Sequence, residues 1–182
     1  MAVRLAQEVV VKVPLYNMIQ KFLFISFIAL STNGFGQPSI ADVLNKFNEH
    51  SVPYIHVEAL SRLETPPILL DTREKAEYDV SHLDKAIHVG FDDFEISKVV
   101  NRIQDKTKMI VVYCSIGVRS ERIGKKLLAE GFTTVYNLYG GIFEWINKDQ
   151  NVYTNAQQRT TKIHPYSKTW GAYVLKGIKV YD

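Results

Sequence analysis

The stretch M-I-V-V-Y-C-S-I-G-V-R-S, residues 109–120, joins an unbroken apolar run to a short loop. Its first five residues, largely β-branched or aromatic, predict a buried strand. From Arg119 to Glu130 apolar residues recur on one helical face, and Gly131 provides a stop. A buried strand that leads directly into an amphipathic helix is typical of parallel sheets. Ligands of such sheets bind at the carboxyl ends of the strands, which is where Cys114 stands.

The same alternation continues outward from this stretch. Four other apolar stretches are candidate strands: Tyr54–Val57, Ile68–Leu70, Ala86–Val89 and Thr134–Leu138. Between them lie helix-like segments, including a helix capped by Ser39, one along Phe94 to Ile103 and a closing one from Ile142 to Asn147. The sequence therefore predicts an α/β fold, a roughly five-stranded parallel sheet with helices on both faces.

The loop after the central strand favours a charged sulfur. Gly117 allows a tight turn, and a loop that enters a helix N-terminus points successive N–H groups at one spot. These amides, the helix dipole and the charge of Arg119 would stabilise a thiolate at Cys114. A buried, inert structural cysteine is the alternative, because free cysteines are commonly buried.

Composition narrows the class of protein. The chain has 182 residues, 46% of them hydrophobic and 23% charged, which is ordinary for one globular domain with a tail and argues against disorder. A net charge of +3 is too small to indicate nucleic acid binding by itself. With Cys114 as its single cysteine, the chain lacks an internal disulfide framework and any zinc site built on cysteine pairs.

The amino-terminal segment has the layout of a secretory signal peptide. Lys21 precedes the apolar run Phe22–Leu30, and Gly34 and Gly36 follow as small residues. We expect residues 1–36 to be this signal, with translation starting at Met18, and the protein to be exported to the periplasm or secreted. A buried element at Phe22–Leu30 is the alternative. The run is too short to span a bilayer comfortably, so we expect no stable membrane insertion after cleavage.

Four stretches in register resemble the rhodanese-like sulfurtransferases. Residues 114–120 are similar to the family's active-site loop, and L-D-T-R-E at 70–74 with Glu77-Tyr78 is similar to its amino-terminal signature. The run 81–88 resembles the continuation of that signature, although Ser81 and Asp84-Lys85 replace the customary glycine and Pro-Gly. G-G-I-F-E-W at 140–145 resembles the carboxy-terminal signature. We therefore expect a helix at 37–51, a rhodanese-like domain at 52–150 and an extension at 151–182.

The resemblance implies sulfur transfer through a persulfide on Cys114. A donor such as thiosulfate would supply the outer sulfur, and a thiol or cyanide would accept it. The expected donor-binding residues are those of the loop: Ser115, Ile116, Gly117, Val118, Arg119 and Ser120. Neither a metal nor an organic cofactor is implied, and the histidines His50, His56 and His164 show no metal-ligand spacing.

Two other functions remain open. Phosphatase or arsenate reductase chemistry uses a related loop whose arginine stands one residue further from the cysteine, where this chain has Ser120. The fold can also serve as a binding module, although such modules usually lack the cysteine that this chain retains. Asp71 and Arg73 either line the same crevice as supports or form an ion pair, and we favour the ion pair.

The extension at 151–182 is basic and aromatic. Its charged residues are Arg159, Lys162, Lys168, Lys176 and Lys179 against Asp182, with five interleaved aromatic side chains that include Trp170. Such a tail can bind nucleic acid or an acidic partner. We expect instead that it folds back on the domain and buries Trp170, and that the partners are a small sulfur donor and a thiol acceptor, without nucleic acid.

Overall fold

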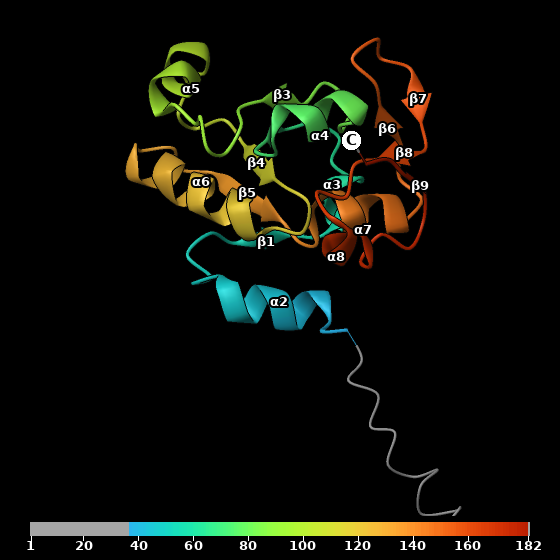
Figure 1. Cartoon of the computed structure of the whole chain (residues 1–182). Helices are drawn as coiled ribbons and strands as arrows, with labels where there is room; N and C mark the ends of the chain where they lie inside the picture. Colours follow the sequence, from blue (N-terminus) through green and yellow to red (C-terminus); the bar gives the residue numbers. More distant parts are fainter. Residues whose placement is uncertain (1–36, 182) are drawn as a thin grey trace, which may run out of the picture. The chain divides into compact units, whose positions relative to one another are not determined.

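Five parallel strands form the centre of the fold, in the order β1-β5-β4-β2-β3 (Figure 1). They are β1 (Tyr54–Ile55), β2 (Ile68–Asp71), β3 (Ile87–His88), β4 (Ile110–Tyr113) and β5 (Val135–Leu138). The computed structural model describes residues 37–181, so the expected signal peptide and the start at Met18 lie outside the described residues. The predicted fold class, a five-stranded parallel sheet with helices, is confirmed.

Strand β4 is the middle of the sheet. All four of its residues are buried, and it pairs with β2 on one side and β5 on the other. Side chains alternate between the two faces of a strand, so Val111 and Tyr113 belong to one core cluster while Ile110 and Val112 belong to the other. This explains why the run reads as continuously apolar.

Helices cover both faces. α5 (Ile96–Arg102) and α6 (Val118–Ala129) bury Val99, Ile123 and Leu127 on the face of Val112. The opposite face packs against α2 (Ile40–Phe47), α3 (Val57–Leu60) and α7 (Gly141–Asn147), and α4 (Lys75–Val80) contributes Tyr78 to that cluster. In Figure 1, α5 and α6 lie on one side of the sheet and α3 and α7 on the other.

The start of α2 agrees with its sequence pattern, whereas α5 begins later than its sequence pattern predicts. Ser39 caps α2, and its hydroxyl accepts from the Asp42 amide while the Asp42 carboxylate accepts from the Ser39 amide. The helix expected along Phe94 to Ile103 begins only at Ile96. Phe94 precedes it and still packs against the same core cluster as Val99.

The carboxy-terminal extension folds back on the domain, as predicted. It contains β6 (Val152–Tyr153) paired with β7 (Arg159–Thr160), then β8 (Lys162–Ile163) paired with β9 (Ile178–Lys179) around α8 (Lys168–Gly171). Its side chains Val152, Ile163 and Val174 are buried in the core cluster that also holds α7. Trp170 is only half-buried, which differs from the predicted burial. In residues 37–181, every helix is too short or too polar to cross a membrane.

Candidate active site

Cys114 directly follows β4 and precedes α6. Gly117 lies between Cys114 and the first residue of α6 and has a φ of 121°. Residues with a Cβ rarely adopt this backbone conformation. The turn aims the Gly117 amide at the Cys114 sulfur, with a nitrogen–sulfur distance of 3.1 Å. The cysteine is only 2% exposed, but it lines a cavity. The inward-facing amide predicted from the loop sequence is therefore present.

The surroundings of Cys114 favour its thiolate. Burial of the sulfur disfavours the charged form and works to raise its pKa. The positive charge of Arg119 and hydrogen bonds from the backbone amides of Ser120 and Gly117 outweigh that penalty. Together they leave the pKa of Cys114 below its ordinary value. A thiolate is the nucleophilic form of cysteine, so the site is prepared for covalent chemistry.

Helix α7 holds the Cys114 loop from behind. The amides of Ile142 and Phe143 donate to the carbonyls of Cys114 and Ser115 at 2.9 and 3.1 Å. Gly141 makes this approach close: a Cβ there would lie 2.3 Å from the Cys114 carbonyl oxygen. Gly141 of the carboxy-terminal signature thus allows α7 to approach and hold the reactive loop.

Asn137 holds the other side of the loop. This fully buried residue of β5 donates through Nδ2 to the Gly117 carbonyl at 2.8 Å and accepts the Ser120 hydroxyl at 2.7 Å. The backbone amides of the same two residues, Gly117 and Ser120, donate to the sulfur. A single amide side chain therefore orients two of the donors that stabilise the thiolate.

Arg119 is bound by a carboxylate. Its two terminal nitrogens lie 2.7 and 2.8 Å from the oxygens of Glu77, and one also bonds the Ser115 hydroxyl at 3.0 Å. Glu77 is 1% exposed. Burial works to raise the pKa of Glu77, yet the hydrogen bond and charge of Arg119, with the charge of Arg73, hold it below its usual value. Much of the positive charge of Arg119 is thus already compensated.

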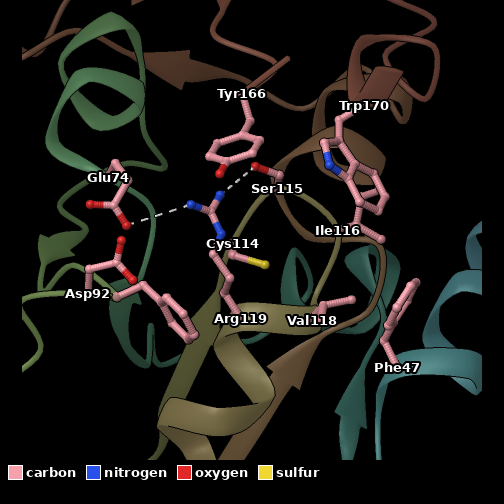
Figure 2. Close-up of a pocket in the computed structure, with 11 residues that line it drawn as sticks. Phe47, Glu74, Asp92, Cys114, Ser115, Ile116, Val118, Arg119, Tyr166 and Trp170 are labelled. Carbon is pink, nitrogen blue, oxygen red and sulfur yellow. Dashed lines mark hydrogen bonds and ion pairs between the residues drawn. The ribbon is translucent and has the colours of Figure 1, made fainter. Parts of the chain in front are cut away.

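The cavity at Cys114 has a volume of about 330 Å³. Of the predicted loop residues, Cys114, Ser115, Ile116, Val118 and Arg119 line it. Gly117 and Ser120 do not line it and lie against the sulfur instead. Figure 2 shows the side chains of Tyr166 and Trp170 from the extension, and Phe47 from α2, around the same space.

Asp71 and Arg73 are not among the residues that line this cavity, and a supporting role for them stays a prediction. Both are fully buried, and the guanidinium bonds the carboxylate at 2.7 Å and the Ser81 carbonyl at 2.6 Å. This is the favoured ion pair. His82 stacks on Tyr78 with ring centres 4.0 Å apart, and its Nδ1 lies 3.1 Å from the Tyr78 carbonyl oxygen.

Several residues of the site were not predicted from the sequence. They include Glu77 as the partner of Arg119, Asn137 behind the loop, and four aromatic residues of the cavity wall: Phe47, Phe91, Tyr166 and Trp170. Asn137 had a usable signal, because it is a polar residue inside a buried strand. The aromatic residues had none, since they come from segments far apart along the chain. Within residues 37–181, we find no cluster of three or more metal-binding side chains.

Curated relatives match part of the chain. Proteins named tRNA uridine(34) hydroxylase from Sodalis glossinidius and Photorhabdus laumondii are each 36% identical over 100 residues, 52% of this chain. That region spans 28% of the relatives' own length. Their name concerns tRNA, so the comparison gives no support to the expected absence of a nucleic acid partner, which stays a prediction.

Solved structures share the fold. A thiosulfate sulfurtransferase from Pseudomonas aeruginosa is 23% identical with a TM-score of 0.53, covering 60% of this chain and 21% of that one. A rhodanese-like domain from Anabaena is 22% identical with a TM-score of 0.52, covering 71% and 89%. The Rhodanese-like domain profile matches residues 56–148, from the start of α3 to the end of α7. The chain therefore belongs to the rhodanese-like domain family.

Proposed function

We propose that this protein is a sulfurtransferase that carries sulfane sulfur as a persulfide on Cys114. The observation that carries the proposal is the sulfur itself, which lies at the start of α6, accepts a hydrogen bond from Gly117 and opens onto a cavity. The lowered pKa of this thiol supplies the nucleophile. The backbone amides of Gly117 and Ser120 would stabilise the negative charge of a persulfide anion.

In the first half-reaction, the Cys114 thiolate attacks the outer sulfur of a donor. With thiosulfate, a new sulfur–sulfur bond forms to Cys114, the bond between the two donor sulfurs breaks, and sulfite leaves with that electron pair. The enzyme then holds a Cys114 persulfide anion. No proton needs to be moved if Cys114 is already ionised.

In the second half-reaction, an external nucleophile removes the sulfur. A thiolate or cyanide attacks the outer sulfur, and the Cys114 thiolate leaves. The chain has one cysteine, so an internal disulfide does not release the sulfur. Turnover therefore depends on an acceptor from outside the chain.

The test is the mass of the intact protein after treatment with a sulfane donor. The wild type should gain one sulfur atom, Cys114→Ser should gain none, and added thiol should remove the sulfur from the wild type. An unmodified wild type with thiosulfate, organic thiosulfonates and polysulfide would overturn the proposal and favour a non-catalytic binding module.

The curated relatives favour a second candidate, a role on tRNA. The supporting observation is the 36% identity over 100 residues with proteins named for tRNA uridine. Binding of labelled tRNA, measured by fluorescence anisotropy at two salt concentrations, tests it. Binding that weakens steeply with salt would support this candidate, and absence of binding would leave the small-molecule function alone.

We also propose export, on the basis of the Lys21 and Phe22–Leu30 layout alone. Export and action on tRNA predict different compartments. Amino-terminal sequencing of the protein from its native source distinguishes them. A chain that begins at Met1 or Met18 would contradict cleavage of a signal, and a chain that begins near Gln37 would support it.

A further inference from the structure

The wall of the active-site cavity is largely aromatic and apolar. It contains Phe47, Phe91, Ile116, Val118, Tyr166 and Trp170, brought together from α2, two loops of the domain, the first turn of α6 and the extension. Phe47 and Tyr166 are 52% and 55% exposed, which is unusual for large side chains that gather at one place. Ligand cavities of this volume commonly combine such walls with a few polar groups.

The charged groups of the same cavity do not favour a doubly negative ligand. Arg119 is the single cation among the described lining residues, and Glu77 already binds it with both oxygens. Glu74, 3.9 Å from Arg119, and Asp92 add two carboxylates to the lining. The cavity therefore repels a small dianion more than it repels a monoanion with an apolar body.

The extension holds its aromatic residues in place over the site. The Arg119 guanidinium lies 5.0 Å from the centre of the Tyr166 ring, within the range of a cation–π contact, and Figure 2 shows the two groups side by side. Tyr166 has a φ of 67°, and its amide donates to a ring nitrogen of His164 at 3.1 Å. Ser167 caps α8, which carries Trp170. Pairing of β8 with β9 closes this segment at its base.

We propose that the site selects sulfur donors of low charge with an aromatic or bulky apolar body, and that Tyr166 and Trp170 are specificity-determining residues. The inference rests on the sulfur transfer proposed above and names its substrate class. With benzenethiosulfonate, the Cys114 thiolate takes the outer sulfur and benzenesulfinate leaves with the electron pair of the broken sulfur–sulfur bond. The phenyl group would lie between Tyr166, Trp170 and Phe47, where thiosulfate has no group to place.

Three donors with the same sulfane chemistry distinguish the effect of the donor's charge from the effect of its apolar group. They are benzenethiosulfonate, methanethiosulfonate and thiosulfate, and each rate is divided by the donor's rate with a small free thiol. We expect kcat/KM for the benzene donor to exceed that for the methane donor by roughly tenfold or more, as burial of an aromatic ring suggests. Thiosulfate should be the poorest of the three. Equal normalised rates for the benzene and methane donors would overturn the proposal.

Variants assign the preference to the extension. Tyr166→Ala and Trp170→Ala should each reduce the benzene-to-methane ratio of kcat/KM at least fivefold, because each removes part of the aromatic wall. Leu175→Ala is the matched control, because Leu175 belongs to the same extension, is 79% exposed and lies outside the cavity lining. An unchanged ratio in both aromatic variants would contradict the assignment.

Binding measured on a variant that cannot form a persulfide tests the substrate class independently of the proposed function. In Cys114→Ser, titration calorimetry should show tighter binding of benzenesulfonate than of methanesulfonate, and Trp170→Ala in that background should remove the difference. If no donor forms a persulfide on the wild type, the proposed function fails whatever the calorimetry shows. If persulfide forms but the two sulfonates bind equally, the substrate class fails alone.

Discussion

Glu77 and Arg119 are joined by two short hydrogen bonds, one from each terminal nitrogen of the guanidinium to a different carboxylate oxygen. Glu77 lies in α4 and Arg119 in the first turn of α6, so the pair connects two helices that are separate along the chain. It also places a negative charge directly behind Arg119, the single arginine among the described residues that line the cavity. Stability and donor preference are therefore coupled at this pair.

Glu77→Gln should weaken the fold at neutral pH and make it less sensitive to acid. The pKa of Glu77 is lowered in the folded protein, below the reference value of 4.5, so its stabilisation is present above 4.5 and is lost as pH falls through the folded value. The variant should lose about 1–3 kcal/mol at pH 7, because a charged hydrogen-bond partner is replaced. Urea denaturation across a pH series measures both effects. Parallel curves for variant and wild type would contradict this prediction.

The thiol of Cys114 should ionise below 9.0, the reference pKa of a free cysteine. Its lowered pKa depends strongly on Arg119, since burial alone would raise it. The ultraviolet absorbance of the thiolate, followed against pH, measures the midpoint, with Cys114→Ser as the blank. Arg119→Gln should move the midpoint upward, and Glu77→Gln should move it downward because it removes an opposing charge. A wild-type midpoint at or above the ordinary value would contradict the prepared thiolate.

Gly141→Ala should displace the reactive loop. The added Cβ would lie 2.3 Å from the Cys114 carbonyl oxygen and 2.7 Å from Ser115 backbone atoms, so backbone must move. Gly90→Ala is a matched control, since both glycines have positive φ, 55° and 69°, but a Cβ at Gly90 would meet a single side-chain atom at 3.8 Å. Gly141→Ala should lose at least about 2 kcal/mol more than Gly90→Ala in chemical denaturation. Equal losses of stability in the two variants would contradict the prediction, because they would show that the Cys114 loop moves away from the added Cβ at little cost.

Arg73→Met should destabilise the protein strongly without a direct effect on the sulfur chemistry. The substitution leaves the fully buried Asp71 carboxylate without its ion-pair partner, which typically costs about 3–5 kcal/mol. The double variant with Asp71→Asn should recover part of that loss. Denaturation of the two variants checks this, and the persulfide mass assay at low temperature serves as a functional control. A stable Arg73→Met protein that forms no persulfide would place Arg73 in the reaction instead.

The sheet and the position of Cys114 were predictable because they depend on local patterns. The apolar run 110–113 is buried on both faces, and Gly117 supplies the backbone conformation that the following turn requires. The ion pair that compensates the charge of Arg119 was not predictable in this way. Its partner Glu77 lies 42 residues away along the chain, and no local sequence pattern joins the two residues. Likewise, Tyr166 and Phe47 approach the sulfur only through tertiary packing.

The family match covers residues 56–148, but some residues that line the cavity lie outside this range. One wall comes from Phe47 before the matched region, and another from Tyr166 and Trp170 after it. Trimming the chain to the shared boundaries would keep the sulfur and its amides while removing both walls. Kinetic work on such a minimal fragment would report the chemistry common to the family and miss the selectivity particular to this protein.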